Sequence, residues 1–124
     1  MSKIEEFQTT RTAYNVALAK YANRSQKTFY GLDATTYQPG ALDKKTKELL
    51  GLVASLVLRC DDCILYHLIE SHKAGVTSEE LSETVAIGLL VGGSITIPHI
   101  RRAIDVWDKE LAATAGTVQE EQAA

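Results

Sequence analysis

Two cysteines, Cys60 and Cys63, are the residues whose types and spacing most directly suggest chemistry, and His67 follows Cys63 by four positions. An α-helix turns by about 100° per residue, so the three side chains fall within about 60° of one another and share one face. Two thiols spaced this way at a helix start can close a disulfide, and an imidazole one turn further along can take a thiol proton. The pattern therefore predicts a redox-active thiol pair with a base beside it.

The charges around these thiols act in opposite directions. Backbone amides at a helix start stabilise a thiolate and pull the pKa of a cysteine from about 8.5 toward neutrality. Asp61 and Asp62 lie between the cysteines, and nearby carboxylates raise a thiol pKa. We expect Cys63 to attack, because His67 lies one turn from it. The counter-argument is that the first cysteine of such a pair, here Cys60, commonly has the lower pKa.

Glu48 is a second feature, since it precedes a run of mostly apolar residues that ends at Leu58. A carboxylate on a mostly buried helix needs a partner. Two arrangements stay open. In one, Glu48 pairs with Arg59 or Lys44 through the packing of neighbouring chains. In the other, two helices fold together and bring Glu48 to His67, where it would orient the imidazole and balance its charge.

The same cysteines could also form half of a zinc site or remain buried structural thiols. A structural zinc takes four ligands, whereas only Cys60, Cys63 and His67 cluster, with no second Cys-x-x-Cys pair. We therefore expect neither a metal nor a cofactor. The other histidines, His72 and His99, are interpreted as surface or helix-end residues, and residues 101–102, both arginine, as a solvated helix face.

The elements that must position these residues are helices, because apolar residues recur at three-and-four spacing and no strand-like alternation flanked by hairpin turns is found. The expected helices cover about residues 3–21, a short stretch within 23–40 that a loop follows, 44–58, 61–74, 78–92 and 98–111. The fold class is therefore all-α, with about five or six helices. We expect a single domain over about residues 1–113 and a flexible C-terminal tail over about residues 114–124.

Local signals mark several of these helix boundaries. Asp43 can cap the helix that contains Glu48. Aspartate suits a first helical turn, so Asp61 predicts a break near residues 59–60 and a new helix after it. Thr77 and Glu80 have the spacing of a capping box.

Composition and charge limit the classes of function. The chain has 124 residues, 45% of them hydrophobic and 23% charged, as expected of a soluble globular domain. Its net charge of −3 without a basic block speaks against nucleic-acid binding. The longest uncharged run, Thr84–Pro98, is shorter than the roughly 18–20 residues of a membrane span, and no secretion signal is seen at the start. We therefore expect a cytoplasmic protein that has no membrane partner.

The spacing of Glu48, Cys60, Cys63 and His67 resembles the alkylhydroperoxidase D-like branch of the carboxymuconolactone decarboxylase family. In that pattern, eleven residues separate the glutamate from Cys-x-x-Cys, and three more precede the histidine. The resemblance runs over about Gly40–Leu111, with weaker support from the sequence directly before Glu48 and from Lys73–Thr77. The prototype has a second histidine between its cysteines, where this chain has Asp62.

The resemblance implies an all-helical fold that assembles into homotrimers or homohexamers. It also implies a thiol peroxidase that reduces small alkyl hydroperoxides while its cysteine pair cycles between dithiol and disulfide. An external dithiol, carried by a lipoyl or thioredoxin-like protein, would restore the reduced pair. Apolar residues from Val85 to Ile97 exceed what one helix easily covers, which independently favours an oligomer.

Two other functions stay open. The first is a lyase of the kind that names the family, acting on a carboxylated small molecule. Its cationic anchors and acid–base pair could come from Arg59, His67, His99 and Arg101. The second is a non-catalytic redox sensor, whose dithiol state would alter a contact with a partner.

Overall fold

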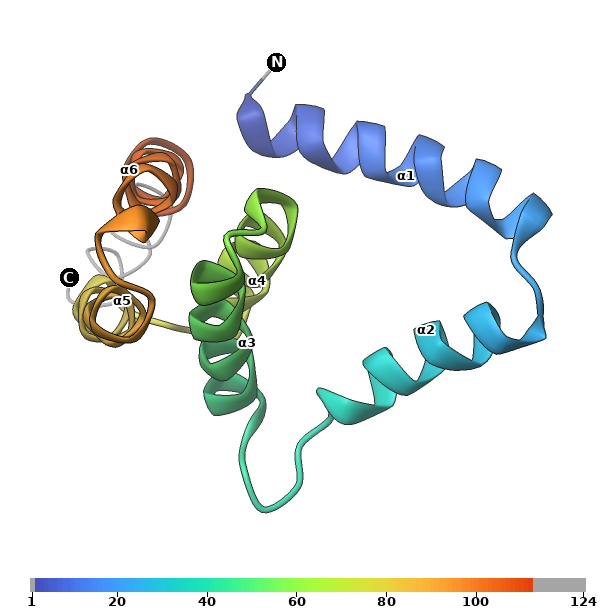
Figure 1. Cartoon of the computed structure of the whole chain (residues 1–124), viewed down its shortest axis with the longest axis horizontal. Coiled ribbons are helices and arrows are strands. Elements are labelled where there is room, and N and C mark those ends of the chain that lie inside the picture. The colour runs from blue at the N-terminus through green and yellow to red at the C-terminus, as the bar shows by residue number, and fades with distance from the viewer. Residues whose placement is uncertain (1, 113–124) are drawn as a thin grey trace, which may run out of the picture. The chain divides into compact units, whose positions relative to one another are not determined.

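The computed structural model of the chain describes residues 2–112, and all regular structure in that range is helical (Figure 1). The predicted all-α fold class is thus confirmed. In chain order the elements are α1 (Lys3–Tyr21), α2 (Arg24–Thr36), α3 (Lys44–Leu58), α4 (Asp61–Lys73), α5 (Ser78–Gly92), the short 3-10 helix η1 (Ser94–Thr96), α6 (Ile97–Val106) and the π-helical segment η2 (Trp107–Ala112).

The chain divides into two compact units, and the boundary in the sequence falls between Ala41 and Leu42. The first contains α1 and α2, and neither helix has a buried residue. Asn23 caps α2 through a reciprocal capping box with Gln26, which helps to explain why α2 is a full helix rather than the short one expected. The single domain over residues 1–113 stays a prediction, and the expected tail lies outside the described residues.

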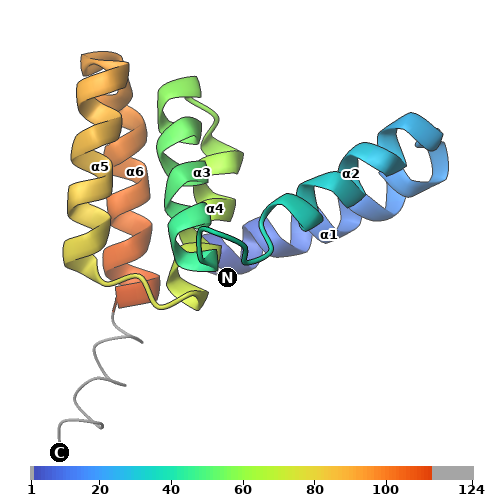
Figure 2. The ribbon, with the colours of Figure 1, turned by 90° about the horizontal axis from the view of Figure 1, so that it is seen from below.

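The second unit holds the core. Helix α3 packs against both α4 and α5, and α6 packs beside α4, so that the four helices form a bundle (Figure 2). Four leucines at its centre are almost completely buried: Leu52 and Leu56 on α3, Leu68 on α4 and Leu81 on α5. Each such side chain contributes roughly 1.5–3 kcal/mol of hydrophobic free energy. This core fixes α3 and α4 against each other.

The boundaries of α3 follow from local chemistry. Asp43 accepts a hydrogen bond from the backbone N–H of Thr46 at 2.7 Å and so caps α3, as predicted. At the other end, Arg59 adopts the left-handed conformation with φ 58°, and the chain turns directly into α4. The predicted break at residues 59–60 is therefore confirmed.

Helix α5 begins with the predicted capping box, in which Thr77 and Glu80 exchange hydrogen bonds of 2.9 and 3.1 Å. Trp107, in η2, donates to the hydroxyl of Ser78 at 2.9 Å and packs edge-on against the ring of His72. The partly exposed His72 thus has a packing role. No helix within residues 2–112 combines the length and apolarity needed to cross a membrane.

Candidate active site

Cys60 and Cys63 are joined by a disulfide at the start of α4, with their Cα atoms 5.2 Å apart. Cys60 is the N-cap residue, and its sulfur accepts a hydrogen bond from the backbone N–H of Cys63 at 3.2 Å. Cys63 is exposed to solvent and Cys60 is partly exposed. The pair is therefore accessible to a reductant and lies at the end of the helix where backbone amides favour negative charge.

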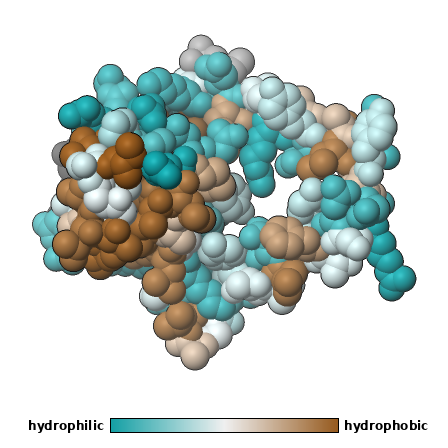
Figure 3. Space-filling view, viewed as in Figure 1, coloured by the Kyte–Doolittle hydropathy of each residue, from teal (hydrophilic) through white to brown (hydrophobic). Residues whose placement is uncertain are grey.

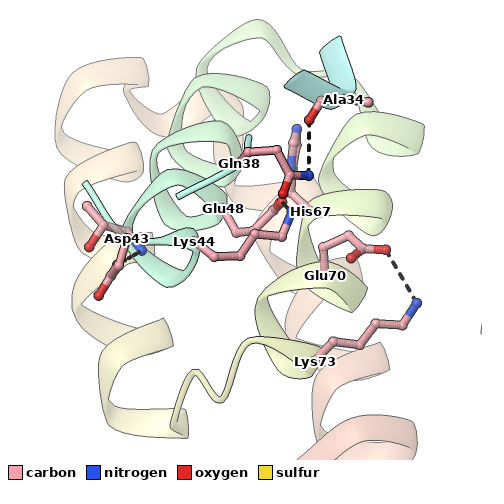
Figure 4. A network of polar contacts seen from close by, with 9 residues as sticks. Ala34, Gln38, Asp43, Lys44, Glu48, His67, Glu70 and Lys73 are labelled. Carbon is pink, nitrogen blue, oxygen red and sulfur yellow. Dashed lines mark hydrogen bonds and ion pairs between the residues drawn. The ribbon is translucent and has the colours of Figure 1, made fainter. Parts of the chain in front are cut away.

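His67 lies one turn after Cys63 in α4, and its ring reaches back to Glu48 on α3 (Figure 4). The distance from His67 Nδ1 to Glu48 Oε2 is 2.9 Å. Glu48 is only 1% exposed and His67 only 9%. Of the two arrangements left open by the sequence, the one in which the helices fold together is thus present.

Lys44 supplies the second partner of Glu48. Its Nζ lies 2.9 Å from Glu48 Oε1, one helical turn away on α3. The hydrogen bond to Glu48 raises the pKa of Lys44 above its ordinary value, so the ammonium stays charged. The expected pairing with Lys44 therefore occurs within the chain rather than between chains. Arg59, the other expected partner, lies at the far end of α3.

The contact with Glu48 determines how His67 can act. A carboxylate only accepts hydrogen bonds, so Nδ1 of His67 carries a hydrogen and donates a hydrogen bond to Glu48. In the neutral imidazole the basic lone pair then belongs to Nε2. The Tyr66 ring packs edge-to-face on His67, with centroids 5.2 Å apart, and helps to hold the ring plane. His67 is thus an oriented base. When it takes a proton, Glu48 would balance the positive charge of the imidazolium.

A polar cluster beside the disulfide was missed by the sequence analysis. Asp61, next to Cys60, receives a contact of 2.7 Å from His99 Nδ1 and one of 3.1 Å from Arg102 Nη2, both on α6. Arg102 is exposed, as expected of a solvated helix face, but it also pairs with Asp61, and His99, although at a helix end, is mostly covered. No local signal links residues so far apart in sequence.

Partial burial acts to raise the pKa of Asp61, but the hydrogen bonds from His99 and Arg102 outweigh it and lower the pKa below its ordinary value. Asp61 is therefore a carboxylate at neutral pH, and its charge is matched by the guanidinium. Within residues 2–112, no group of three or more histidine, cysteine or acidic side chains is arranged to hold a metal ion.

Comparison with known proteins assigns the family. Residues 24–106 match the carboxymuconolactone decarboxylase family, and the chain belongs to it. This confirms the family that the spacing of the site residues indicates, and the alkylhydroperoxidase D-like branch stays a prediction.

Two solved structures share the fold over nearly their whole length. One is a carboxymuconolactone decarboxylase family protein from Thermotoga maritima, described as a candidate participant in an antioxidative response. It is 42% identical, with a TM-score of 0.79 over 96% of this chain and 97% of that one. The other, a family member from Legionella pneumophila in its apo form, is 27% identical, with a TM-score of 0.80 over 90% and 99% of the two chains. An uncharacterized protein of Cupriavidus necator is 28% identical over 74% of this chain and 81% of its own length.

Proposed function

We propose that this protein is a cytoplasmic dithiol peroxidase that reduces small alkyl hydroperoxides at the expense of an external dithiol. The observation that carries the proposal is the disulfide between Cys60 and Cys63, one helical turn before a histidine bound to a buried glutamate. This combination supplies a redox pair, a base and a group that balances the base's charge. The antioxidative description of the Thermotoga maritima relative is consistent with it.

The first half of the cycle begins with the reduced pair. His67 takes the proton of Cys63, and the thiolate attacks the terminal oxygen of the hydroperoxide. A sulfur–oxygen bond forms, the oxygen–oxygen bond breaks, and the leaving alkoxide takes the proton from His67 and departs as an alcohol. Cys63 is thereby oxidised to a sulfenic acid. Glu48 stabilises the imidazolium between the two proton transfers.

The second half restores the dithiol. The thiol of Cys60 attacks the sulfenic sulfur of Cys63, a disulfide forms, and the hydroxyl leaves as water. The resulting disulfide corresponds to the state seen in the structure. An external dithiol, on a lipoyl or thioredoxin-like protein, then reduces it by thiol–disulfide exchange and is itself oxidised. Asp62 stands where the prototype has its second histidine, so in this cycle His67 is the group that moves the proton, with Glu48 behind it.

Peroxide consumption under excess dihydrolipoamide tests this function. The wild-type protein should consume many equivalents of tert-butyl hydroperoxide, and Cys60→Ser and Cys63→Ser should each abolish turnover. A redox sensor would instead consume one equivalent per disulfide and stop. After peroxide treatment, a sulfenic-acid trap should label Cys63 in the Cys60→Ser variant. If the trap labelled Cys60 in the Cys63→Ser variant but did not label Cys63 in the Cys60→Ser variant, the assigned order would be reversed.

The lyase alternative has less support, because His99, one of its candidate anchors, is bound to Asp61. Decarboxylation of a carboxylated lactone needs no disulfide. Full turnover of such a substrate by a Cys60→Ser, Cys63→Ser double variant would contradict the peroxidase proposal and favour the lyase.

A further inference from the structure

The cluster formed by Asp61, His99 and Arg102 has no part in the reaction steps above, yet it directly adjoins the redox pair. Asp61 follows Cys60 in the first turn of α4, whereas the other two members come from α6. Both carboxylate oxygens of Asp61 are engaged, with Arg102 Nη2 at 3.3 and 3.1 Å and His99 Nδ1 at 2.7 Å. The cluster therefore ties the start of α4 to α6.

Thiol chemistry at this position needs the charge of Asp61 to be offset. Formation of a thiolate beside a carboxylate is opposed by like-charge repulsion. The charged and titratable groups around the pair are Arg59 directly before it, Asp61 and Asp62 within its turn, His67 one turn later, and His99 and Arg102 across from Asp61. Of these groups, Arg102 and His99 contact Asp61, the carboxylate next to Cys60 in the sequence.

We propose that Arg102, assisted by His99, is a positioning residue that neutralises Asp61 and thereby keeps the reduced cysteines reactive near neutral pH. His99 holds the carboxylate in place, and Arg102 supplies the opposite charge. The inference rests on the proposed redox function, because only a pair that cycles through the dithiol state needs a thiolate. The proposal explains how the Asp61 carboxylate can lie beside a thiol pair whose thiolate it would otherwise destabilise.

The test measures the rate of iodoacetamide alkylation of the reduced protein against pH, with each thiol quantified by mass spectrometry. The midpoint is the pH at which the alkylation rate of the more reactive thiol is half its maximum. Arg102→Gln leaves the Asp61 carboxylate uncompensated, so this midpoint should rise by about half a pH unit. Asp61→Asn leaves the guanidinium without its partner, so the midpoint should fall by a similar amount. The double variant, in which both charges are gone, should return close to the wild-type midpoint.

These opposite signs separate charge compensation from a purely structural role. If the cluster only held α4 against α6, both single variants would loosen the same contact and shift the midpoint in the same direction. That result would overturn the proposal. Arg102→Lys keeps the charge and should stay near the wild-type midpoint, whereas a shift equal to that of Arg102→Gln would also overturn it.

Arg101→Gln is the matched control, because it removes the neighbouring guanidinium of α6, which is exposed and not part of the cluster. It should move the midpoint by less than half as much as Arg102→Gln, and an equal shift would contradict the specific role of Arg102.

Asp61 and Arg102 are each about half exposed, so 1 M salt should reduce the shifts. The assay uses no peroxide. If the midpoints move as expected but the protein shows no peroxide turnover, the proposed function is refuted and the charge compensation is not.

Discussion

At the residue scale, Glu48 is the centre of the candidate site. Its carboxylate is nearly inaccessible to solvent, and each oxygen has a partner of its own: Lys44 on one side and His67 on the other. Lys44 compensates the buried charge at one carboxylate oxygen, and the other oxygen faces the imidazolium that forms when His67 takes a proton.

Replacement of Glu48 by glutamine should lower kcat/KM for tert-butyl hydroperoxide by about 10- to 100-fold. Glutamine keeps the shape of the side chain but cannot balance the imidazolium, so the base weakens. The measurement is steady-state peroxide consumption at several pH values, with dihydrolipoamide as the reductant.

The control for this prediction is Glu70→Gln, which removes a carboxylate from the same helix pair. Glu70 is bound to Lys73 at 3.4 Å (Figure 4). Its replacement should leave kcat/KM within about twofold of the wild-type value. If Glu48→Gln were equally harmless, Glu48 would have only a structural role.

The site was predictable where its residues are neighbours in one helix. Cys60, Cys63 and His67 share a face of α4 because of their spacing alone. The contact of Glu48 with His67 depends on how α3 and α4 fold together, so the sequence could offer it only as one of two arrangements. Asp61 and His99 are 38 positions apart, and nothing local marks their contact.

At the scale of the elements, the close approach of α5 to the following 3-10 helix depends on a glycine. A Cβ atom at Gly92 would lie 2.5 Å from Thr96 Cγ2. Thr96 is completely buried, and its hydroxyl donates to the carbonyl of Gly93 at 2.8 Å, so this side chain cannot move aside. Position 92 therefore has no room for a larger residue.

We expect Gly92→Ala to lower the free energy of unfolding by about 1–3 kcal/mol, because the added methyl group overpacks this turn. Urea denaturation followed by circular dichroism measures the effect. Gly31→Ala in α2 is the control, since a Cβ there would meet nothing within 4 Å. Alanine is the better helix former, so this variant should lose no stability and could gain up to about 1 kcal/mol. An unchanged stability for Gly92→Ala would contradict the packing argument.

Helix boundaries were predictable where capping is local. Asp43 with Thr46, and Thr77 with Glu80, form caps from residues three apart, and such pairs can be recognised in a sequence. The 3-10 helix η1 and the π-helical segment η2 carry no comparable signal. Trp107, in η2, is held by Ser78 from a distant part of the chain, which a sequence pattern does not reveal.

At the scale of the whole molecule, large apolar side chains lie exposed on the second unit. Figure 3 shows hydrophobic surface gathered over α3 and α5. The large apolar residues exposed on these two helices are Leu50, Leu58, Ile87, Leu89, Leu90 and Val91. A patch of this kind on one folded unit is typical of an interface between copies. We propose that the protein is a homotrimer or homohexamer and that these residues are covered in the assembly.

Sedimentation equilibrium should accordingly give a mass of three or six chains. Leu90 is 84% exposed, so Leu90→Glu should not disturb the fold of one chain but should shift the equilibrium toward smaller species. Glu79→Gln, an exposed substitution at the other end of α5, is the control and should leave the mass unchanged. A wild-type protein that sediments as a single chain at all concentrations would refute the assembly.

The sulfur of Cys60 has two tasks, since it closes the disulfide and also accepts the hydrogen bond that begins α4. A change in oxidation state consequently alters the hydrogen bond of one main-chain group, the amide of Cys63. The NMR chemical shift of that amide proton should therefore report the fraction of protein that is oxidised, without any added dye. Serine, which can accept the same bond, is for this reason a gentler replacement than alanine when only the electron transfer is to be removed.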